Sequence, residues 1–385
     1  MKIIYITTAL ESHDYKEFVK LWKRSPNPSN QNFHNKMIRS LALTHKVDVI
    51  SIRPFSKKLC TVKKFPKSIK EDGNITWNYV LIKNNKISRY LSVINQYHKL
   101  YKKEVMTDCV IVTDTINPLC LSAATYLGKK HKIPVIGVCT DSPSNITGTK
   151  RAYTMYLAKK ARFCSGFITL TDELNIIYNR NKKPSITIEG IVDNIDYLPI
   201  EVERPYFYFG GSLLKRYGVY NLIEAFKSLH RDDIDLLIAG HTYHENELMQ
   251  SISDCPNIKF LGTVSIDQNF AYECNAIANI NPRPYSEDLD RFSIPSKTLE
   301  YLSSGVPTIS IKNSKLMNKF KDEILWVNSN EVEDLKNMMD EDLNSSFEER
   351  QDFGRKAKEK VQLLYSLNQI NNEVIYFISA FLNKK

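Results

Sequence analysis

Short apolar runs alternate along the chain with longer stretches of helical spacing. In the first half, the runs that fit buried strands cover residues 2–6, 46–52, 109–114, 133–139, 166–170 and 185–189. Most of them are separated by segments whose apolar residues recur every three or four positions, as in an amphipathic helix. This alternation predicts a parallel sheet with helices on both faces.

The same pattern starts again in the second half after a break. The runs that fit strands there cover residues 206–211, 234–240, 257–262, 276–282, 307–311 and 324–327. Between the two series, residues 193–205 contain two prolines and mixed charges that interrupt the regularity. We therefore predict an α/β chain of two doubly wound, Rossmann-like domains that face a cleft, over residues 1–198 and 199–365. The last stretch, about 366–385, has helical spacing and is expected to pack back on the first domain.

Composition agrees with two cores in a soluble protein. The chain has 385 residues and is 42% hydrophobic, more than one core usually supports. No apolar run approaches the roughly 18 residues that a membrane span needs, and the segment "MKIIYITTAL" lacks the layout of a signal peptide. Seven cysteines without CxxC spacing indicate neither a disulfide framework nor a zinc site. We expect a cytoplasmic protein.

Basic charge is concentrated in the first half. Residues 1–200 contain 32 Lys and Arg against 15 Asp and Glu, whereas the remainder contains 21 against 28. Within residues 57–70 and 83–103 the basic residues are interleaved with Tyr, Phe, Leu and Ile, a mixture typical of proteins that bind an anionic membrane face. Nucleic acid is the competing partner and a solvated surface is the third interpretation. We expect the membrane, and no nucleic acid.

Three loops that follow strands in the second half suit an anionic ligand, which doubly wound sheets bind beyond the carboxyl ends of their strands. In "YFGGSLLKRYG" (208–218), Gly210 and Gly211 let the backbone approach a phosphate, and Lys215 and Arg216 neutralise it. A tight turn would also explain the glycine pair. The second loop, 281–291, carries Arg283. The third opens the segment "PSKTLEYLSSGVPTI" (295–309).

The third loop predicts a helix that begins against a ligand. The start at Ser296, Lys297 and Thr298 provides backbone N–H groups and the positive end of the helix dipole. Glu300, one turn further, can accept two hydroxyl hydrogen bonds. Gly305 and Pro307 then end the helix so that the next strand can begin. The plain alternative is a pair of solvated side chains at Lys297 and Glu300.

These segments together resemble the retaining glycosyltransferases of the GT-B fold, in particular the family-four group of bacterial polysaccharide enzymes. The resemblance covers nearly the whole chain, and its most specific element is the 295–309 segment. The other matching segments are "GSLLKRYG" (211–218), "LLIAG" (236–240), "IKFLG" (258–262) and "NINPRP" (279–284).

The resemblance implies roles for individual residues. The helix start binds the diphosphate and sugar of a nucleotide-sugar donor, and Glu300 binds the ribose hydroxyls. The implied donor-binding residues are Gly210, Gly211, Ser212, Gly240, Arg283, Ser296, Lys297, Thr298 and Glu300. Lys215 and Arg216 are the implied catalytic cations, and Asp141 stands in the loop where many relatives place a histidine. Asn32 or His34, in the helix before the second strand, are expected to face the acceptor.

Two departures from the family pattern concern the donor site. The usual glutamate pair is spaced by seven residues, which places its first member at Phe292, where no carboxylate is present. The common phosphate loop also carries Arg and Lys where this chain has Ser212 and Tyr217, so Lys215 and Arg216 are expected to substitute for them.

The resemblance implies transfer of a hexose-type sugar from a UDP-linked donor, with retention and without metal or cofactor. The expected acceptor is a glycan or lipid-linked oligosaccharide of cell-surface polysaccharide biosynthesis, such as capsule, reached from the inner face of the cell membrane. A non-catalytic glycosyltransferase-like partner and a nucleotide-sugar 2-epimerase are the alternatives. Asp288-Leu-Asp290 and the pair His241 and His244 are the remaining metal-binding patterns, and neither has the context of a site.

Overall fold

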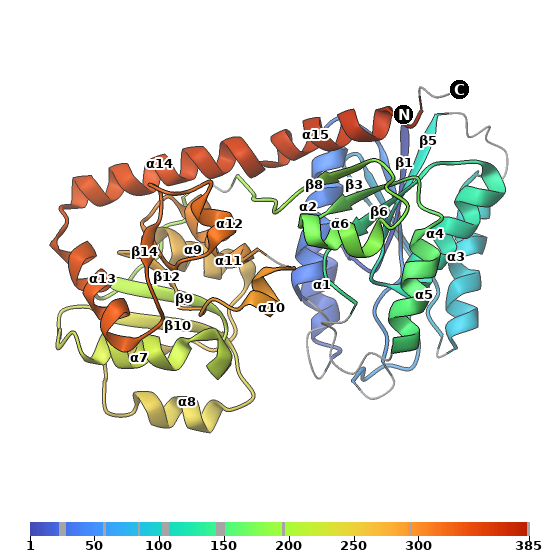
Figure 1. The fold of residues 1–385 in the computed structure, drawn as a ribbon. Helices are drawn as coiled ribbons and strands as arrows, with labels where there is room; N and C mark the ends of the chain where they lie inside the picture. The colour runs from blue at the N-terminus through green and yellow to red at the C-terminus, as the bar shows by residue number, and fades with distance from the viewer. Residues whose placement is uncertain are drawn as a thin grey trace. The chain divides into compact units, whose positions relative to one another are not determined.

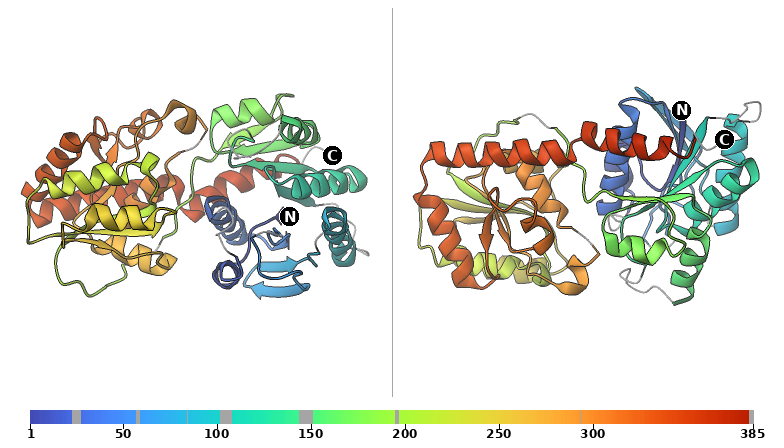
Figure 2. Two further views of the ribbon diagram at one scale, coloured as in Figure 1. Left: turned by 90° about the horizontal axis from the view of Figure 1, so that it is seen from below. Right: turned by 45° about the horizontal axis from the view of Figure 1, so that its top comes forward.

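The computed structural model describes residues 1–22, 28–56, 59–83, 85–101, 108–143, 151–194, 197–292 and 294–382, with only the backbone at 288 and 289. The chain forms two compact units. Unit 1 comprises Met1–Ile191, Arg291–Ser293 and Leu367–Lys385, and unit 2 comprises Val192–Asp290 and Ile294–Ser366. In each unit, helices lie on both faces of a sheet (Figure 1, Figure 2).

Unit 1 is built on an eight-stranded sheet in the order β3-β4-β2-β1-β5-β6-β7-β8. Its strands are β1 (Lys2–Thr7), β2 (Val47–Ser51), β3 (Ser68–Asp72), β4 (Ile75–Tyr79), β5 (Cys109–Asp114), β6 (Val135–Cys139), β7 (Gly166–Thr169) and β8 (Ser185–Thr187). Its helices are α1 (Ser12–Val19), α2 (Pro28–Ala42), α3 (Lys86–Tyr101), α4 (Pro118–His131), α5 (Arg151–Ala161), α6 (Asp172–Tyr178) and α15 (Leu367–Ser379).

All pairings in this sheet are parallel except that of β3 with β4. These two strands, which form a hairpin around Gly73, were not predicted from the sequence. Gly73 has φ +55°, a conformation that glycine adopts without strain. The signal was the Asp-Gly pair between "SIKED" and "ITWNY", which is a frequent hairpin turn.

The two faces of the unit 1 sheet carry different helices. The contacts run from α3 to α4, from α4 to α5 and from α5 to α6, which makes one continuous layer. The C-terminal helix α15 instead packs against α2. Ile370, Val374 and Ile378 of α15 are buried in the same hydrophobic core as strands β1 and β5. This four-residue spacing is the helical pattern present in the sequence.

Unit 2 is built on a six-stranded sheet in the order β11-β10-β9-β12-β13-β14, with every pairing parallel. Its strands are β9 (Tyr206–Ser212), β10 (Asp235–His241), β11 (Ile258–Phe260), β12 (Asn279–Asn281), β13 (Thr308–Ile311) and β14 (Leu325–Val327). Its helices are η1 (Lys215–Tyr217), α7 (Val219–Lys227), α8 (Glu245–Ile252), α9 (Ile266–Asn275), α10 (Glu287–Asp290), α11 (Ser296–Ser304), α12 (Ser314–Met317), α13 (Val332–Asn344) and α14 (Phe347–Tyr365).

Each unit has its own core, and the predicted α/β fold of two Rossmann-like domains is confirmed. The chain passes from unit 1 to unit 2 at Ile191 and Val192 and returns at Ser366 and Leu367. Residues 291–293 also belong to unit 1. Among the described residues, no helix is both long enough and apolar enough to cross a bilayer.

Candidate functional site

The strand order of unit 2 reverses between β9 and β12. From β9 the chain builds outward through β10 to β11, and it then returns to the other side of β9 with β12 and continues to β13 and β14. Such a reversal is the position at which doubly wound sheets bind ligands, outside the carboxyl ends of the strands. The residues that follow β9, β10 and β12 are therefore the candidates for a site in this unit.

Two glycines let the loops at this reversal approach each other. Gly218, between β9 and α7, has φ +80°, and a Cβ atom there would lie 2.1 Å from the carbonyl oxygen of Pro282, just after β12. Gly240, in β10, has φ +143°, and a Cβ atom there would lie 1.7 Å from the carbonyl oxygen of Gly211. Because both neighbours are backbone atoms, neither glycine can be enlarged without moving a loop.

A tyrosine from α11 fixes the end of β9. The N–H of Gly210 donates to the Tyr301 hydroxyl at 3.0 Å, and this hydroxyl donates to the Gly210 carbonyl oxygen at 3.2 Å. Gly210 is buried, and a Cβ atom there would lie 2.4 Å from Oδ1 of Asn269. Gly211 is half-buried and Ser212 is exposed. Gly210 therefore serves packing, whereas Gly211 and Ser212 remain at the surface of the loop.

Lys215 and Arg216 are exposed in η1, on the loop after β9. The Arg216 guanidinium donates to the Tyr217 hydroxyl at 3.1 Å and lies 4.9 Å from the centroid of the Tyr217 ring. Both cations are thus placed where a solvated anion can reach them, at the reversal of strand order.

The start of α11 is held to the end of β12. The Thr298 hydroxyl accepts a hydrogen bond from the Asn281 amide at 2.8 Å, and the Thr298 N–H donates to the carbonyl of Pro295 at 3.0 Å. Thr298 is completely buried, so its role is to anchor the helix rather than to present a group to a ligand. Ser296 is exposed, and Pro295 at the cap position supplies no side-chain hydrogen bond.

Lys297 lies between two carboxylates. Its Nζ is 3.0 Å from Oε2 of Glu300 and 3.8 Å from Oε1 of Glu273. Burial disfavours the ammonium ion, but Glu300 and Glu273 outweigh this effect and raise the pKa of Lys297. The side chains of Lys297 and Glu300 are 34% and 23% exposed. Both remain accessible from the surface of the site.

Glu273 is a site residue that the sequence analysis missed. Its side chain is completely buried, and the Asn269 amide donates to its Oε1. It lies on α9 among the buried residues Phe270, Ala271 and Cys274. A glutamate on the apolar stripe of an amphipathic helix was the available signal, because carboxylates are almost never buried without a partner.

Arg283 contacts an aspartate rather than pointing to solvent. Its Nη2 lies 2.8 Å from Oδ1 of Asp290, and the N–H of Ser286 donates to the other carboxylate oxygen at 2.8 Å. The pair closes the loop 281–290. Arg283 and Asp290, the second aspartate of the DxD pattern, thus stabilise this loop, while Nε of Arg283 has no hydrogen-bond partner among the described residues. The side chain of Asp288 lies outside the described residues.

Phe292 occupies the position of the missing carboxylate and has an apolar environment. It is half-buried and packs against the core of unit 1. Arg291, with its guanidinium 5.3 Å from the Phe292 ring centroid, accepts a hydrogen bond at its carbonyl from the Thr171 hydroxyl at 3.3 Å. The departure from the family pattern thus replaces a charge by a packing residue.

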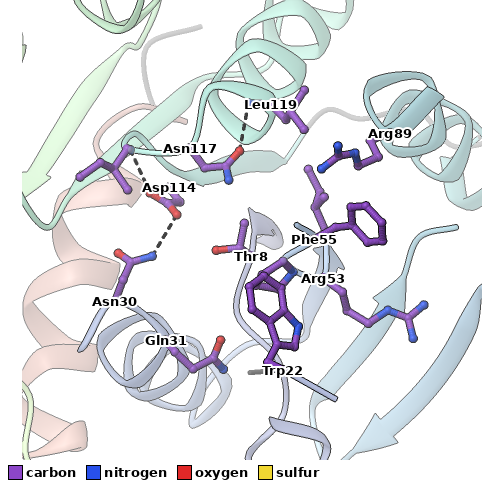
Figure 3. A pocket seen from close by; sticks show the side chains of 13 residues that line it. Thr8, Trp22, Asn30, Gln31, Arg53, Phe55, Arg89, Asp114, Asn117 and Leu119 are labelled. Carbon is purple, nitrogen blue, oxygen red and sulfur yellow. Dashed lines mark hydrogen bonds between the residues drawn. The ribbon is translucent and has the colours of Figure 1, made fainter. Parts of the chain in front are cut away.

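Unit 1 has its own reversal of strand order, between β1 and β5, and a cavity lies there. This β1–β5 cavity has a volume of about 310 Å³ (Figure 3). It is lined by Thr8, Trp22, Asn30, Gln31, Ile52, Arg53, Pro54, Phe55, Arg89, Asp114, Ile116, Asn117 and Leu119. Most of these residues follow the carboxyl ends of β1, β2 and β5, where a doubly wound sheet binds ligands.

The two predicted acceptor residues do not line this cavity. Asn32 is exposed, and His34 is completely buried, with its Nδ1 2.7 Å from the Tyr5 hydroxyl and its Nε2 3.7 Å from Oδ1 of Asp114. The prediction that His34 faces an open cleft is therefore wrong. Asn30 and Gln31 of the same helix line the cavity instead, because they lie one turn nearer the start of the helix than His34.

Asn30 belongs to a buried polar network rather than to a helix cap. The helix begins at Pro28, so Asn30 lies within its first turn. The Asn30 amide donates to Asp114 at 3.1 Å, and its oxygen accepts from the Thr140 hydroxyl at 2.6 Å (Figure 3 shows the first bond). Burial opposes ionisation of Asp114, but His34, Asn30 and the Ile116 amide outweigh it and lower the pKa of Asp114.

Asp141 follows β6 at the carboxyl edge of the unit 1 sheet and is half-buried. Its Oδ1 accepts the N–H of Ser142 at 2.7 Å, the local hydrogen bond that an Asp-Ser-Pro turn needs. The Tyr178 hydroxyl donates to its carbonyl at 3.1 Å. Of the turn "TDSPSN", Ser144 and Asn145 lie outside the described residues.

One group of described residues has the spacing of a metal site. Glu11, His13 and Asp14 of unit 1 lie close enough to share an ion. However, the Lys70 ammonium is already 2.5 Å from Glu11 and 3.2 Å from Asp14. His241 and His244 are exposed, and His244 lies 3.9 Å from Glu247.

Residues 193–360 match the family model described as "Glycosyl transferases group 1". The matched segment covers nearly all of unit 2 and includes the loops after β9, β10 and β12. No curated protein sequence matches the chain.

Solved structures that resemble the whole chain share its fold at low sequence identity. One is a sucrose-phosphate synthase from Thermosynechococcus elongatus, with TM-score 0.71, 13% identity and full coverage of both chains. Another is the E. coli trehalose-6-phosphate structure bound with UDP-2-fluoro glucose, with TM-score 0.68, 12% identity and full coverage of both chains. A third is Anabaena HepE in complex with UDP and glucose, with TM-score 0.66 and 13% identity over 99% of this chain and 100% of that one.

Proposed function

We propose that this protein is a glycosyltransferase that moves a hexose-type sugar from a UDP-linked donor to a glycan or lipid-linked acceptor with retention of configuration. The observation that carries the proposal is that two independent features fall on the same segment. The segment that matches group 1 glycosyl transferases is the segment whose strand order reverses beside Lys297 and Glu300. The UDP and UDP-2-fluoro glucose in two similar structures support the choice of nucleotide.

The donor would lie across the loops of unit 2. Glu300 would accept hydrogen bonds from the ribose hydroxyls. The diphosphate would face Lys297, the start of α11 and the exposed cations Lys215 and Arg216. Lys297 is held charged by two carboxylates before a donor arrives. The exposed cations Lys215 and Arg216 add positive charge that would stabilise a leaving diphosphate in the way a metal ion does, so the proposed reaction needs no metal.

In the proposed reaction, the bond between the sugar C1 and the diphosphate oxygen breaks as a bond from C1 to the acceptor oxygen forms on the same face. The acceptor proton passes to the departing phosphate oxygen, and UDP leaves with a negatively charged diphosphate. Lys215 and Arg216 stabilise that charge as it develops. Asp141, at the carboxyl edge of the unit 1 sheet, is the proposed contact for the sugar or the acceptor hydroxyl.

The test is release of UDP from UDP-glucose and related donors in the presence of EDTA, with the product anomer read by NMR. We expect Lys215→Gln and Arg216→Gln each to lower turnover by about 100-fold, because each removes a cation that acts in the transition state. Lys321→Gln is the matched control. Lys321 is exposed in unit 2 but precedes β14, at the opposite edge of the sheet. Turnover equal to that of the native chain in all three variants would remove both cations from the mechanism.

One observation favours a second candidate, a non-catalytic glycosyltransferase-like partner or glycan-binding subunit. Phe292 stands where the family carries a carboxylate, and it packs into an apolar core. A chain of this kind would bind the nucleotide without turning over any sugar donor. UDP binding together with no product from any donor and acceptor would select it.

We also propose that unit 1 docks on an anionic membrane, peripherally at the inner face of the cell membrane, to reach a lipid-linked acceptor. Helices α3, α4 and α5 lie side by side in one layer and contain no Asp or Glu (Figure 1). They contain eight Lys and Arg, of which all but the cavity residue Arg89 are counted toward the surface. The same helices expose the large apolar side chains Ile87, Leu91, Tyr126, Met155 and Tyr156. Basic charge beside exposed apolar side chains suits an anionic lipid surface.

Flotation with vesicles measures this docking. We expect the protein to bind vesicles with anionic lipid, to bind neutral vesicles poorly and to lose binding as salt rises. Charge reversal at Lys129, Lys130, Lys159 and Lys160 should weaken binding at least about tenfold, since each lysine near the surface contributes roughly 1 kcal/mol. Reversal at Lys63, Lys64 and Lys67, also exposed, tests the segment 57–70 separately. Binding that ignores salt and every reversal contradicts the proposal.

A further inference from the structure

The β1–β5 cavity of unit 1 gathers hydrogen-bond donors that have no partner. Nε1 of Trp22, Nε of Arg53 and Nε of Arg89 are buried and form no hydrogen bond within the described part of the chain. All three residues line the cavity. A buried donor without an acceptor costs about 1–3 kcal/mol, and three in one cavity indicate that a ligand supplies the acceptor atoms.

The charge of the lining favours an anion. It contains two arginines against one carboxylate, that of Asp114. Asp114 is completely buried, and its oxygens already accept from the Asn30 amide and the Ile116 N–H. Burial lowers the pKa of both Arg53 and Arg89, which shows that their charges are only partly compensated. Neither guanidinium forms an ion pair with any described residue.

The two arginines have different roles. Nη2 of Arg53 donates to the carbonyls of Pro66 and Val80, and the guanidinium lies 5.3 Å and 5.2 Å from the ring centroids of Phe65 and Tyr79, so its position is fixed. The Arg89 guanidinium lies 5.3 Å from the Phe55 ring centroid. Phe55 is itself part of the cavity lining, and Nε of Arg89 has no hydrogen-bond partner within the described residues, so this donor is available to a ligand.

The lining also offers apolar surface for a sugar ring. Figure 3 shows the side chains of Trp22, Phe55, Arg89 and Asn117 around the cavity. Ligand sites combine aromatic surface of this kind with a few convergent polar groups, and a volume of about 310 Å³ is at the small end of their range. The size suits one sugar unit with one charged substituent.

We propose that the β1–β5 cavity binds the acceptor through an anionic group, a phosphoryl or carboxylate group, which pairs with Arg89 and accepts a hydrogen bond from the Trp22 indole. Calling this ligand the acceptor rests on the proposed function. The anion preference itself rests only on the cavity. The charged group selects the acceptor, while the aromatic side chains contact the sugar to which it is attached.

Calorimetric titration of the full chain in phosphate-free buffer tests this preference. The probes are glucose, glucuronate, glucose 6-phosphate, inorganic phosphate and a short-chain prenyl diphosphate sugar. We expect at least one charged sugar to bind about tenfold or more tightly than glucose, because a charge-assisted hydrogen bond contributes about 1.5–3 kcal/mol. Preference for the prenyl diphosphate sugar over glucose 6-phosphate would identify a lipid-linked acceptor, and the reverse order a soluble one.

Three variants assign the preference to the cavity. Arg89→Gln should abolish the difference between charged and neutral sugars, and Arg89→Lys should restore part of it, since lysine keeps the charge but loses the planar fork. Trp22→Phe should weaken binding of the charged sugar several-fold by removing one donor. Arg162→Gln, an exposed arginine of unit 1 outside the cavity, should change nothing.

The outcomes separate this proposal from the function on which it rests. Equal affinity for charged and neutral sugars, or inorganic phosphate bound as tightly as any charged sugar, would overturn the acceptor subsite even if UDP binds and sugar is transferred. A lost preference in Arg89→Gln with unchanged UDP binding supports it. If the native chain prefers charged sugars but does not bind UDP, the subsite stands and the proposed function fails.

Discussion

Replacing Glu300 with glutamine raises the dissociation constant for UDP about 10- to 100-fold in our account. In the proposed donor site the carboxylate accepts hydrogen bonds from two ribose hydroxyls, and hydrogen bonds to a charged group contribute about 1.5–3 kcal/mol each before compensation by the amide. Glu300 is 23% exposed and 3.0 Å from Lys297, so the glutamine variant should fold. Calorimetric titration of the full chain with UDP measures the change.

Glu333→Gln is the matched control for this variant. Glu333 lies 3.9 Å from Lys336 at the same spacing along a helix of unit 2, but on α13 rather than at the reversal of strand order. Its UDP affinity should equal that of the native chain. Unchanged affinity in Glu300→Gln as well would mean that the carboxylate faces no ribose, and the orientation of the donor would have to be abandoned.

Gly218→Ala should destabilise unit 2 by about 2–4 kcal/mol and weaken UDP binding with it. The added Cβ would lie 2.1 Å from the Pro282 carbonyl oxygen, and φ is +80°, so both overpacking and a strained backbone contribute. For a domain of this size the loss corresponds to a fall of about 5–15 °C in the midpoint of thermal unfolding. The relevant transition is the one that UDP shifts upward.

Gly262→Ala separates the two causes. Gly262 has a similar φ, +67°, but no atom lies within 4 Å of the position that a Cβ would take. Its alanine variant should show the backbone penalty alone, about 1 kcal/mol, with UDP affinity unchanged. Equal losses in the two variants would show that the close approach of the loops after β9 and β12 does not matter to the site.

The central strands that the sequence predicted, such as β5 and β6, are buried on both faces, whereas the predicted edge strand β8 is not. Strand β4 was missed although it is largely buried. Near-continuous β-branched runs are typical of parallel strands that are covered on both faces, so β5 and β6 are evident from the sequence alone. The edge strand β3 is different because four of its five residues are exposed. Its sequence "SIKED" therefore lacks an apolar signature, and only the following Asp-Gly turn indicated it.

The site in unit 2 could be predicted where a loop has a specific sequence motif. The ion-pair partners of individual side chains could not be predicted. Lys297 and Glu300 do stand together at a helix start, as the sequence predicted. Arg283 was expected at a phosphate but pairs with Asp290, seven residues later. Which carboxylate an arginine contacts depends on how the loop folds back, and no local sequence pattern shows this.

The cavity of unit 1 was missed because Arg89 lies within a segment that the sequence analysis treated as a basic surface. However, Arg89, Val93, Tyr97 and Tyr101 are spaced by four residues, and the last three are buried. This spacing places Arg89 on the inward stripe of α3 rather than among the exposed lysines. An arginine in register with an apolar stripe was the signal for a polar cavity.

The central claim is that unit 2 binds a nucleotide-sugar donor. The most direct measurement is calorimetric titration of the native full chain with UDP, GDP, ADP, CDP and dTDP in buffer without divalent metal. The account predicts saturable binding of UDP with one site per chain and weak or no binding of the others. Absence of binding by any of the five would contradict it.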